Sequence, residues 1–243
     1  ILLAHLITRP VKRAWDQQTQ FIADASHELK TPLTVILADT DIIAAHPQTQ
    51  VAEQMKWVCG IKDEAMHMKG LVEELLFLAR NDEGGAGAGA HGKQEPINLS
   101  ALAQESCLAF DAVAFEANVE LNEDIEDGVE IRADKIQVER LIRSLIDNAV
   151  KYAGTQGRVT VKLHKKKKDR AVFTVNNTGP VIPANELLHV FDRFWRSDTS
   201  RTRGTTASYG LGLAIAKSIA QAQGADISVT STERDGTTFT VEF

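Results

Sequence analysis

The feature that most constrains the fold is Gly84-Gly-Ala-Gly-Ala-Gly-Ala-His-Gly92, a run of glycine and alanine interrupted by one histidine. Such a run has almost no side chain to bury, and it behaves as a flexible linker with a root-mean-square reach of about 15 to 18 Å. We expect two halves that are tethered but able to move, joined by a linker over residues 84–95.

Two long amphipathic helices are predicted before the linker. Over residues 11–46, apolar or small side chains recur at steps of three and four, and Pro32 within this stripe is expected to kink the helix. Ala45-His-Pro-Gln48 ends the pattern, and a second stripe follows. The two stripes comprise Phe21, Ala25, Leu29, Pro32, Leu33, Ile36, Thr40 and Ile43, and then Val51, Met55, Val58, Ile61, Ala65, Met68, Val72, Leu75 and Leu78. One hairpin covers both stripes poorly, so we expect a second copy to complete a four-helix bundle; a hairpin packed on the C-terminal half is the alternative.

The residues after Pro96 mix helical and strand-like patterns. Helices are predicted at 100–115, 134–152 and 211–223, and strands at 119–122, 129–132, 158–163, 171–177, 226–231 and 237–243. The last two strands are joined by the turn Glu233-Arg-Asp-Gly236, which predicts a hairpin. Because strands and helices follow no regular βαβ period, the pattern favours an α+β sandwich.

Composition limits the class of partner. The formal net charge of −6 argues against general nucleic-acid binding, which favours a basic surface. Cys59 and Cys107 match no metal-ligand spacing and are expected to be buried or partly buried thiols in a reducing cytosol. The run Lys165–Lys168 favours a solvated hairpin tip over a surface for anionic lipid.

The first residues allow two interpretations. Residues 1–7 are apolar but too few to cross a bilayer, which takes about 20, and basic residues follow at 9–13. An apolar stub before basic residues is typical of the inner end of a transmembrane helix. An ordinary helix start explains the pattern equally well.

The segment His27-Glu-Leu-Lys-Thr-Pro-Leu33 carries the first candidate site. His27 lies off the apolar stripe and is expected to face solvent, where a neutral imidazole nitrogen is a competent nucleophile near pH 7. Glu28 is placed to accept a proton or hydrogen bond from the other ring nitrogen. The segment resembles the phosphoacceptor box of sensor histidine kinases. Thr31 completes a Glu-x-x-Thr pattern similar to that of members that also dephosphorylate their response regulator.

Arg140–Tyr152 is similar to the N box of the same family, in which an asparagine oxygen ligates the Mg²⁺ that bridges the ATP phosphates. Asn148 matches that asparagine, and Mg²⁺ favours hard oxygen ligands of this kind. Lys151 is expected to reach a phosphate, and Tyr152 to pack near the base. Ser144 stands where many members have a first asparagine, so no metal role is expected for it.

Thr174–Pro183 resembles the G1 box, and Gly179 is its glycine. Asn177 stands where the family usually has an aspartate that accepts a hydrogen bond from the adenine amino group. An amide oxygen still accepts this bond, with less strength than a carboxylate. Replacing Asn177 by aspartate is therefore expected to strengthen adenosine binding by about 1 kcal/mol. Val181 replaces the second glycine of the usual pattern, which predicts a stiffer loop.

Phe191-Asp-Arg-Phe194 is similar to the F box, and its aromatic side chains are also expected to enter the core. Arg196 follows and is expected to contact the nucleotide. Residues 197–209 look like the lid that closes over ATP, with Arg201 or Arg203 approaching a phosphate.

Gly210-Leu211-Gly212-Leu213 resembles the G2 box and opens an apolar helix. Glycines at a helix N-terminus let backbone N–H groups and the helix dipole meet phosphate. Ser208 stands near the place of a further glycine in the family. Gly236-Thr-Thr-Phe239 resembles the short box that closes the domain and is expected to be structural.

Five motifs in the family's order cover residues 21–239, almost the whole chain. The resemblance implies an all-α helical hairpin that forms a dimeric four-helix bundle, followed by an α+β (α/β sandwich) ATP-binding domain of the gyrase, MutL and histidine kinase type. The expected divisions are a membrane-proximal end at 1–13, a dimerisation and histidine phosphotransfer domain at 14–83, the linker at 84–95, and a catalytic domain at 96–243.

The resemblance also implies a function. It is autophosphorylation of His27 with ATP and Mg²⁺, then phosphotransfer to an aspartate of a response regulator receiver domain, with regulator phosphatase activity. A homodimer and an upstream membrane segment are implied, which would place the chain at the cytoplasmic face of the cell membrane. One alternative is another ATPase of the same superfamily, which has no use for the His27 segment. The other is a non-catalytic dimeric scaffold with a decayed ATP site, suggested by Asn177, Val181 and Ser208.

Overall fold

The computed structural model describes residues 2–83, 93–166, 170–196 and 209–243. The chain forms two compact units, Ile1–Phe77 and Leu78–Phe243. Residues 84–92 of the expected linker (84–95) and residues 197–208 of the expected lid (197–209), with Arg201, Arg203 and Ser208, lie outside the described residues.

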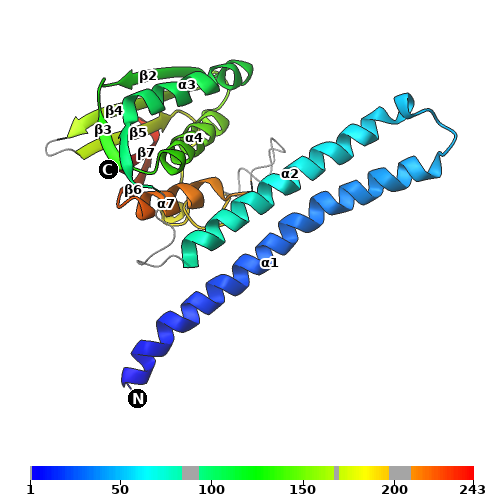
Figure 1. Ribbon diagram of the computed structural model, residues 1–243, viewed down its shortest axis with the longest axis horizontal. Helices are drawn as coiled ribbons and strands as arrows, with labels where there is room; N and C mark the ends of the chain where they lie inside the picture. The colour runs from blue at the N-terminus through cyan, green and yellow to red at the C-terminus, as the bar shows by residue number, and fades with distance from the viewer. Residues whose placement is uncertain (1, 84–92, 167–169, 197–208) are drawn as a thin grey trace. The chain divides into compact units, whose positions relative to one another are not determined.

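A helical hairpin forms the first unit (Figure 1). Its helices are α1 (Leu2–Ala45) and α2 (Val51–Glu83), which confirms the two helices expected from the sequence. The helix α1 runs without a break through Pro32, which is buried. Since proline has no N–H, the carbonyl of Glu28 loses its helical partner there. The turn between the helices is held by Gln54 Nε2, which donates to the His46 carbonyl at 2.9 Å.

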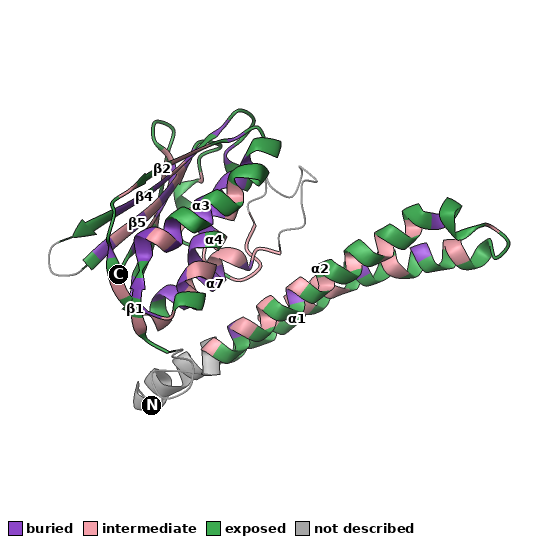
Figure 2. Cartoon of the chain, turned by 45° about the horizontal axis from the view of Figure 1, so that its top comes forward, coloured by how far each residue is buried: buried purple, intermediate pink, exposed green. Residues whose placement is uncertain are grey.

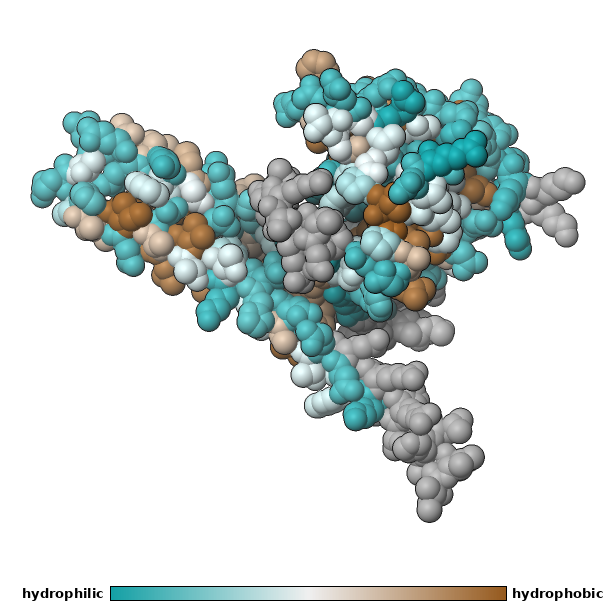
Figure 3. All heavy atoms as spheres, turned by 180° about the vertical axis from the view of Figure 1, so that it is seen from behind, coloured by the Kyte–Doolittle hydropathy of each residue, from teal (hydrophilic) through white to brown (hydrophobic). Residues whose placement is uncertain are grey.

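Only part of the expected α2 stripe is buried in this unit. The buried or half-buried residues of the described hairpin portion of α2 include Gln54, Trp57, Ile61, Met68, Leu71 and Leu75. Five residues expected in the stripe are instead exposed, namely Val51 (67%), Met55 (46%), Val58 (38%), Val72 (41%) and Ala65. Figure 3 shows hydrophobic side chains in brown among hydrophilic ones along the hairpin surface. The helix α2 therefore has an inner and an outer set of apolar residues, and one hairpin covers only the inner set.

The second unit is a five-stranded sheet with helices on one face (Figures 1 and 2). The strand order is β2-β4-β5-β7-β6, with β2 and β4 parallel and every other neighbouring pair antiparallel. The strands are β2 (Glu120–Ile125), β4 (Arg158–Lys166), β5 (Arg170–Asn177), β6 (Asp226–Thr232) and β7 (Gly236–Glu242). The helices are α3 (Leu99–Glu116), α4 (Lys135–Tyr152) and α7 (Gly212–Ala222). This arrangement confirms the α+β sandwich and its C-terminal hairpin.

Two short elements were not expected from the sequence. The strand β1 (Glu95–Asn98) pairs antiparallel with β3 (Glu130–Ala133) in a separate ribbon. With four residues, one of them Pro96, β1 is too short to show a period of two. The helix α5 (Ala184–Leu187) is a single turn without a buried residue, so it has no apolar stripe from which it could be predicted.

The core of the second unit lies between the sheet and the helices, where Figure 2 shows most of the buried residues. Every second residue of the central strands is buried there, because strand side chains alternate between faces. The buried residues of α4 form one face: Val138, Leu141, Ile142, Leu145, Ile146, Ala149 and Val150. Packing against this core fixes α4 and α7, the two helices that carry the N-box and G2-box residues.

The two cysteines have different environments. Cys107 on α3 is buried, as expected, and its burial raises the pKa of the thiol to about 12, assisted by the nearby Glu123 and Asp111 carboxylates. Cys59 on α2 is exposed, so the expectation of a buried or half-buried thiol was wrong for this residue. Among the described residues, no helix has both the length and the apolar content that a membrane span requires.

Candidate functional site

His27 lies on α1 with its side chain exposed, as its place off the apolar stripe predicts. Glu28 is half-buried beside it. Neither side chain is hydrogen-bonded to another described residue. The imidazole is therefore accessible from solvent. The expected contact between Glu28 and the imidazole is not formed in this structure.

Thr31 differs from the other hydroxyl side chains described on α1. Four of them donate to the carbonyl four residues earlier, at 2.5–2.9 Å: Thr19, Ser26, Thr34 and Thr40. The exposed Thr31 hydroxyl makes no such bond to the His27 carbonyl and has no other described partner. Its hydroxyl is thus available to water or a ligand one turn after His27.

Asn177 ends β5 and is 3% exposed. Its Nδ2 donates to the carbonyls of Tyr152, at 3.3 Å, and Thr178, at 2.6 Å. Because both partners are acceptors, the amide nitrogen must lie on that side. The Oδ1 atom is then a buried acceptor without a partner. A buried polar atom without a hydrogen bond is costly, so this position fits a ligand that brings an N–H donor.

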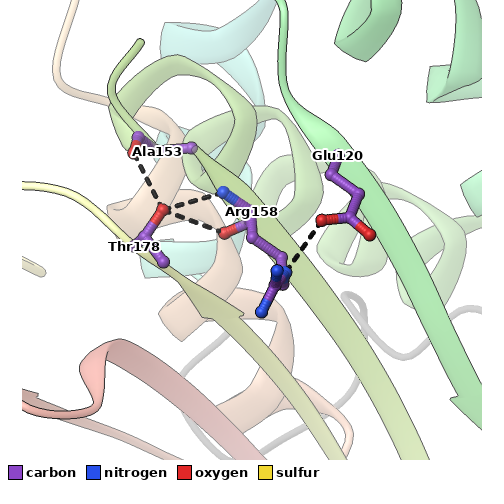
Figure 4. A network of polar contacts seen from close by, with 4 residues as sticks. All are labelled: Glu120, Ala153, Arg158 and Thr178. Carbon is purple, nitrogen blue, oxygen red and sulfur yellow. Dashed lines mark hydrogen bonds and ion pairs between the residues drawn. The ribbon is translucent and has the colours of Figure 1, made fainter. Parts of the chain in front are cut away.

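Thr178 ties the G1 turn to the connection between α4 and β4 (Figure 4). Its hydroxyl accepts from the Arg158 N–H at 2.8 Å and donates to the Ala153 carbonyl at 3.0 Å. Arg158 Nε also donates to Glu120 Oε2 at 2.9 Å, which links β4 to β2. The pKa of the Glu120 carboxyl lies below its usual value, mainly because of this hydrogen bond. The turn carrying Asn177 and Gly179 is therefore anchored at several points.

Gly179 lies directly against α4. Its φ of +131° is a conformation that other residues rarely adopt, and a Cβ atom there would overlap the Tyr152 carbonyl oxygen. Gly236, at the start of β7, has φ +72° and would meet the Asn177 carbonyl in the same way. The resemblance alone gave Gly236 only a structural role. The structure shows that the missing side chain of Gly236 lets β7 approach the backbone of Asn177 closely.

Asn148 and Lys151 lie near the C-terminal end of α4. The half-buried Asn148 side chain has no hydrogen-bond partner among the described residues, so a hard oxygen ligand is uncommitted there. Mg²⁺ in phosphate sites takes one or two such protein ligands together with phosphate oxygens and water, and Asn148 fits that requirement. Lys151 Nζ lies 2.6 Å from Asp147 Oδ2, so in this structure the lysine is paired with a carboxylate one turn earlier. Tyr152 contributes its carbonyl, and its side chain is 38% exposed.

The start of α7 presents backbone donors. Gly210 has φ +69°, a conformation that favours glycine, and its carbonyl accepts from the Phe194 N–H at 3.0 Å. Leu211, the N-cap residue, gives no side-chain hydrogen bond to the first turn. The first N–H groups of α7 therefore lack a side-chain partner and suit an anion. Leu211 is 1% exposed and Leu213 is half-buried, so these two residues serve the site through their backbone.

Two more residues belong to the candidate site, Ser144 and Arg196. Ser144 Oγ donates to the Gly212 carbonyl at 2.8 Å and so ties the N-box helix to the G2 box. The sequence predicted only that Ser144 has no metal role; its bond to Gly212 could not be predicted, because only the fold brings these two residues together. Arg196 is half-buried, and its Nε is a buried donor without a partner.

Two family models match the chain. The His Kinase A (phospho-acceptor) domain matches residues 17–84, and the Histidine kinase-, DNA gyrase B-, and HSP90-like ATPase matches residues 133–243. The first range contains His27 and Thr31, and the second contains Asn148, Asn177 and Gly212.

Individual proteins show the same relationship. The chain is 32% identical to the sensor histidine kinase YkoH of Bacillus subtilis (strain 168) over 233 residues, which are 96% of this chain and 49% of that protein. It resembles the structure of full-length ShkA in complex with AMPPNP, with a TM-score of 0.68 and 25% identity over 92% of this chain and 45% of that one. It shares its fold with histidine kinase ThkA in complex with response regulator protein TrrA, with a TM-score of 0.74 and 19% identity over 96% of this chain and 63% of that one. The chain spans about half the length of the curated relatives it matches.

Proposed function

The chain belongs to the two-component sensor histidine kinases and has their dimerisation and catalytic domains, and from this premise we propose that it phosphorylates His27 with Mg²⁺-ATP and passes the phosphoryl group to an aspartate of a response regulator. The observation that carries the proposal is Asn177. Its buried Oδ1, which has no hydrogen-bond partner among the described residues, is the acceptor for the adenine amino group, beside Gly179 and the end of α4.

The remaining residues have separate tasks. The N–H groups at Gly212 and Leu213 bind phosphate, and Arg196 contributes a donor. Asn148 would hold Mg²⁺, and the ion would supply positive charge to neutralise the transferring phosphate. Lys151 gives up its ion pair with Asp147 and contacts phosphate instead. The exposed side chain of Tyr152 packs at the base.

The chemistry takes place at the imidazole of His27. One ring nitrogen attacks the γ-phosphorus of ATP, a P–N bond forms, and the P–O bond to the leaving ADP breaks. The other ring nitrogen gives its proton to Glu28, which must approach for this step. The receiver aspartate then attacks the phosphoryl group, and the P–N bond breaks. Thr31 orients the water that later hydrolyses the regulator's acyl phosphate.

The proposed function requires a second copy of the chain, a response regulator and a membrane anchor. The outer apolar residues of α2 are the surface that a second copy covers. The complex of ThkA with TrrA provides the precedent for a response regulator as partner. Residues 1–13, the expected membrane-proximal end, follow a membrane segment in the proposed full-length protein, with this chain on the cytoplasmic side.

The test is incubation with γ-labelled ATP and Mg²⁺, followed by mapping of the label. We expect acid-labile, base-stable phosphate on His27. His27→Gln should lose the label but keep ATP binding and dimerisation, because His27 is exposed and lies in a different unit from Asn177. His67→Gln, which changes another exposed histidine, is the matched control and should label normally. Label on His46 or His67 would contradict the assignment, and absence of nucleotide binding in the unchanged chain would favour the scaffold.

A further inference from the structure

The side chain of Gln223 joins three separate segments of the second unit. Its Oε1 accepts from the backbone N–H of Asp134 at 2.9 Å and from Gln94 Nε2 at 3.0 Å. Its Nε2 donates to Gln137 Oε1 at 3.0 Å. Gln223 is the C-cap residue of α7, but its backbone N–H performs the capping, so the side chain is not needed to end the helix.

The partners of Gln223 lie at defined points of the fold. Asp134 is the N-cap of α4, and its carboxylate accepts from the Gln137 N–H at 3.1 Å. Gln94 directly precedes β1, where the described chain resumes after residues 84–92. One amide thus connects the end of α7, the start of α4 and the segment that enters from the phosphotransfer domain.

A second tie between α4 and α7 lies at the other end of α7. There Ser144 Oγ donates to the Gly212 carbonyl at 2.8 Å. The two helices therefore run antiparallel, and side-chain hydrogen bonds hold both ends of α7. Between the ties both helices bury apolar side chains, including Leu141 and Ile215. Apolar packing is non-directional, so hydrogen bonds are needed to fix the helices along their axes.

The register of these helices matters for nucleotide binding. The helix α4 carries Asn148, and α7 begins at Gly212 with its free N–H groups. A sliding of α7 along α4 changes the distance between the metal ligand and the phosphate donors. A shift of about 1.5 Å corresponds to one residue along the helix, which is enough to break hydrogen bonds at the site.

We propose that Gln223 is a positioning residue that keeps α7 in register with α4 for Mg²⁺-ATP binding and makes this register depend on the position of Gln94. The inference rests on the proposed kinase function, because that function identifies the bound nucleotide as Mg²⁺-ATP. Because Oε1 is shared between Gln94 and the start of α4, a displacement of Gln94 changes the bond that holds α4. Signals that arrive through the interdomain segment therefore reach both nucleotide-binding helices through one side chain.

The test compares Gln223→Met with Gln221→Met, which changes an exposed glutamine on the same helix. Methionine has a similar length but no hydrogen bond. We expect Gln223→Met to weaken AMPPNP-Mg²⁺ binding by about three- to tenfold, with the phosphorylation rate at saturating ATP within about twofold of the unchanged chain. Gln221→Met should change neither quantity. Unchanged affinity in Gln223→Met, or a lower melting temperature with a matching loss of active fraction, would overturn the proposal.

A conservative variant separates positioning from general packing. In Gln223→Glu the carboxylate still accepts from Asp134 and Gln94, and the Gln137 amide can turn to donate. This variant should recover most of the affinity; if it binds as weakly as the methionine variant, the hydrogen bonds are not the cause. Gln94→Met should weaken binding less, and adding it to Gln223→Met should have no further effect. Additive losses would contradict the coupling to the incoming segment.

Hydrogen exchange gives a readout that needs no nucleotide. The Asp134 amide should exchange faster in Gln223→Met than in Gln221→Met, because its acceptor is gone. Equal exchange would overturn the proposed tie even if kinase activity is present. If the exchange difference is present but the unchanged chain does not bind nucleotide, the proposed function is rejected and the tie between Gln223 and Asp134 is kept.

Discussion

Asn177 holds its amide nitrogen against two carbonyl oxygens, and this contact leaves Oδ1 as the acceptor that the proposed function assigns to the adenine amino group. Sequence comparison alone favoured an aspartate here, because a carboxylate is the stronger acceptor. The hydrogen bonds of Asn177 support the opposite prediction. An aspartate would place an oxygen against the carbonyls of Tyr152 and Thr178, where only a donor fits.

We therefore predict that Asn177→Asp lowers the free energy of unfolding by about 2 to 3 kcal/mol at pH 7, since two hydrogen bonds are lost and like partial charges meet. Its affinity for adenosine nucleotides should fall as well. Burial against carbonyls raises the pKa of the new carboxyl, so the loss of stability should be largest above that pKa and shrink as acid protonates the group. Urea unfolding and nucleotide titration across pH measure both effects. Asn185→Asp on the exposed α5 is the control, and tighter binding by Asn177→Asp would contradict the reasoning.

The second prediction at this scale concerns Thr31. Its hydroxyl is not used in the helix, unlike those of Thr19, Ser26, Thr34 and Thr40. Thr31→Ala should therefore lose most regulator dephosphorylation and keep much of the autophosphorylation, in which the imidazole itself is the nucleophile. Both rates are measured on one purified variant with its regulator. Thr34→Ala is the matched control and should keep both activities; equal loss of both activities in Thr31→Ala would assign Thr31 a helical role only.

At the scale of helices and strands, the sequence predicts well wherever one face is buried. The helix α4 and the strands β4 to β7 were expected close to their observed bounds, because their apolar residues follow a single period. The helix α2 shows the limit of this reasoning. It has an inner and an outer apolar set, so the predicted stripe mixed half-buried residues such as Ile61 with exposed ones such as Val51.

The candidate site shows a different limit. The motifs indicate Asn148, Asn177 and Gly212 by residue type and order. They do not show that Asn177 bonds to Tyr152, that Ser144 bonds to Gly212, or that Gln223 bonds to Asp134. Each of these pairs is far apart in sequence and meets only through the packing of α4 against β5 or α7. Local patterns therefore predict which residue types act, and tertiary contacts decide how they are held.

At the scale of the whole molecule, the apolar surface of the hairpin requires a partner. Leu37 is 56% exposed on α1, together with the outer residues of α2. Large apolar side chains on both helices of an isolated hairpin are typical of a surface covered in an oligomer. This supports the proposed dimeric bundle.

We predict that Leu37→Glu shifts the chain from dimer to monomer at micromolar concentrations, because a charge would be buried between copies. Sedimentation velocity measures the change. Leu108→Glu is the matched control, since Leu108 is 74% exposed on α3 in the other unit and should leave the dimer intact. A dimer that tolerates Leu37→Glu would place the contact on another surface.

The contrast between the two cysteines has a practical consequence for spectroscopy. Cys59 is exposed on the hairpin, whereas Cys107 is buried with a pKa of about 12 and forms almost no thiolate near neutral pH. The unaltered chain thus offers one addressable thiol for a fluorophore or spin label. A second label should attach only when the ATP-binding unit unfolds. The same reagent therefore reports on the hairpin in the folded protein and on the integrity of the other unit during denaturation.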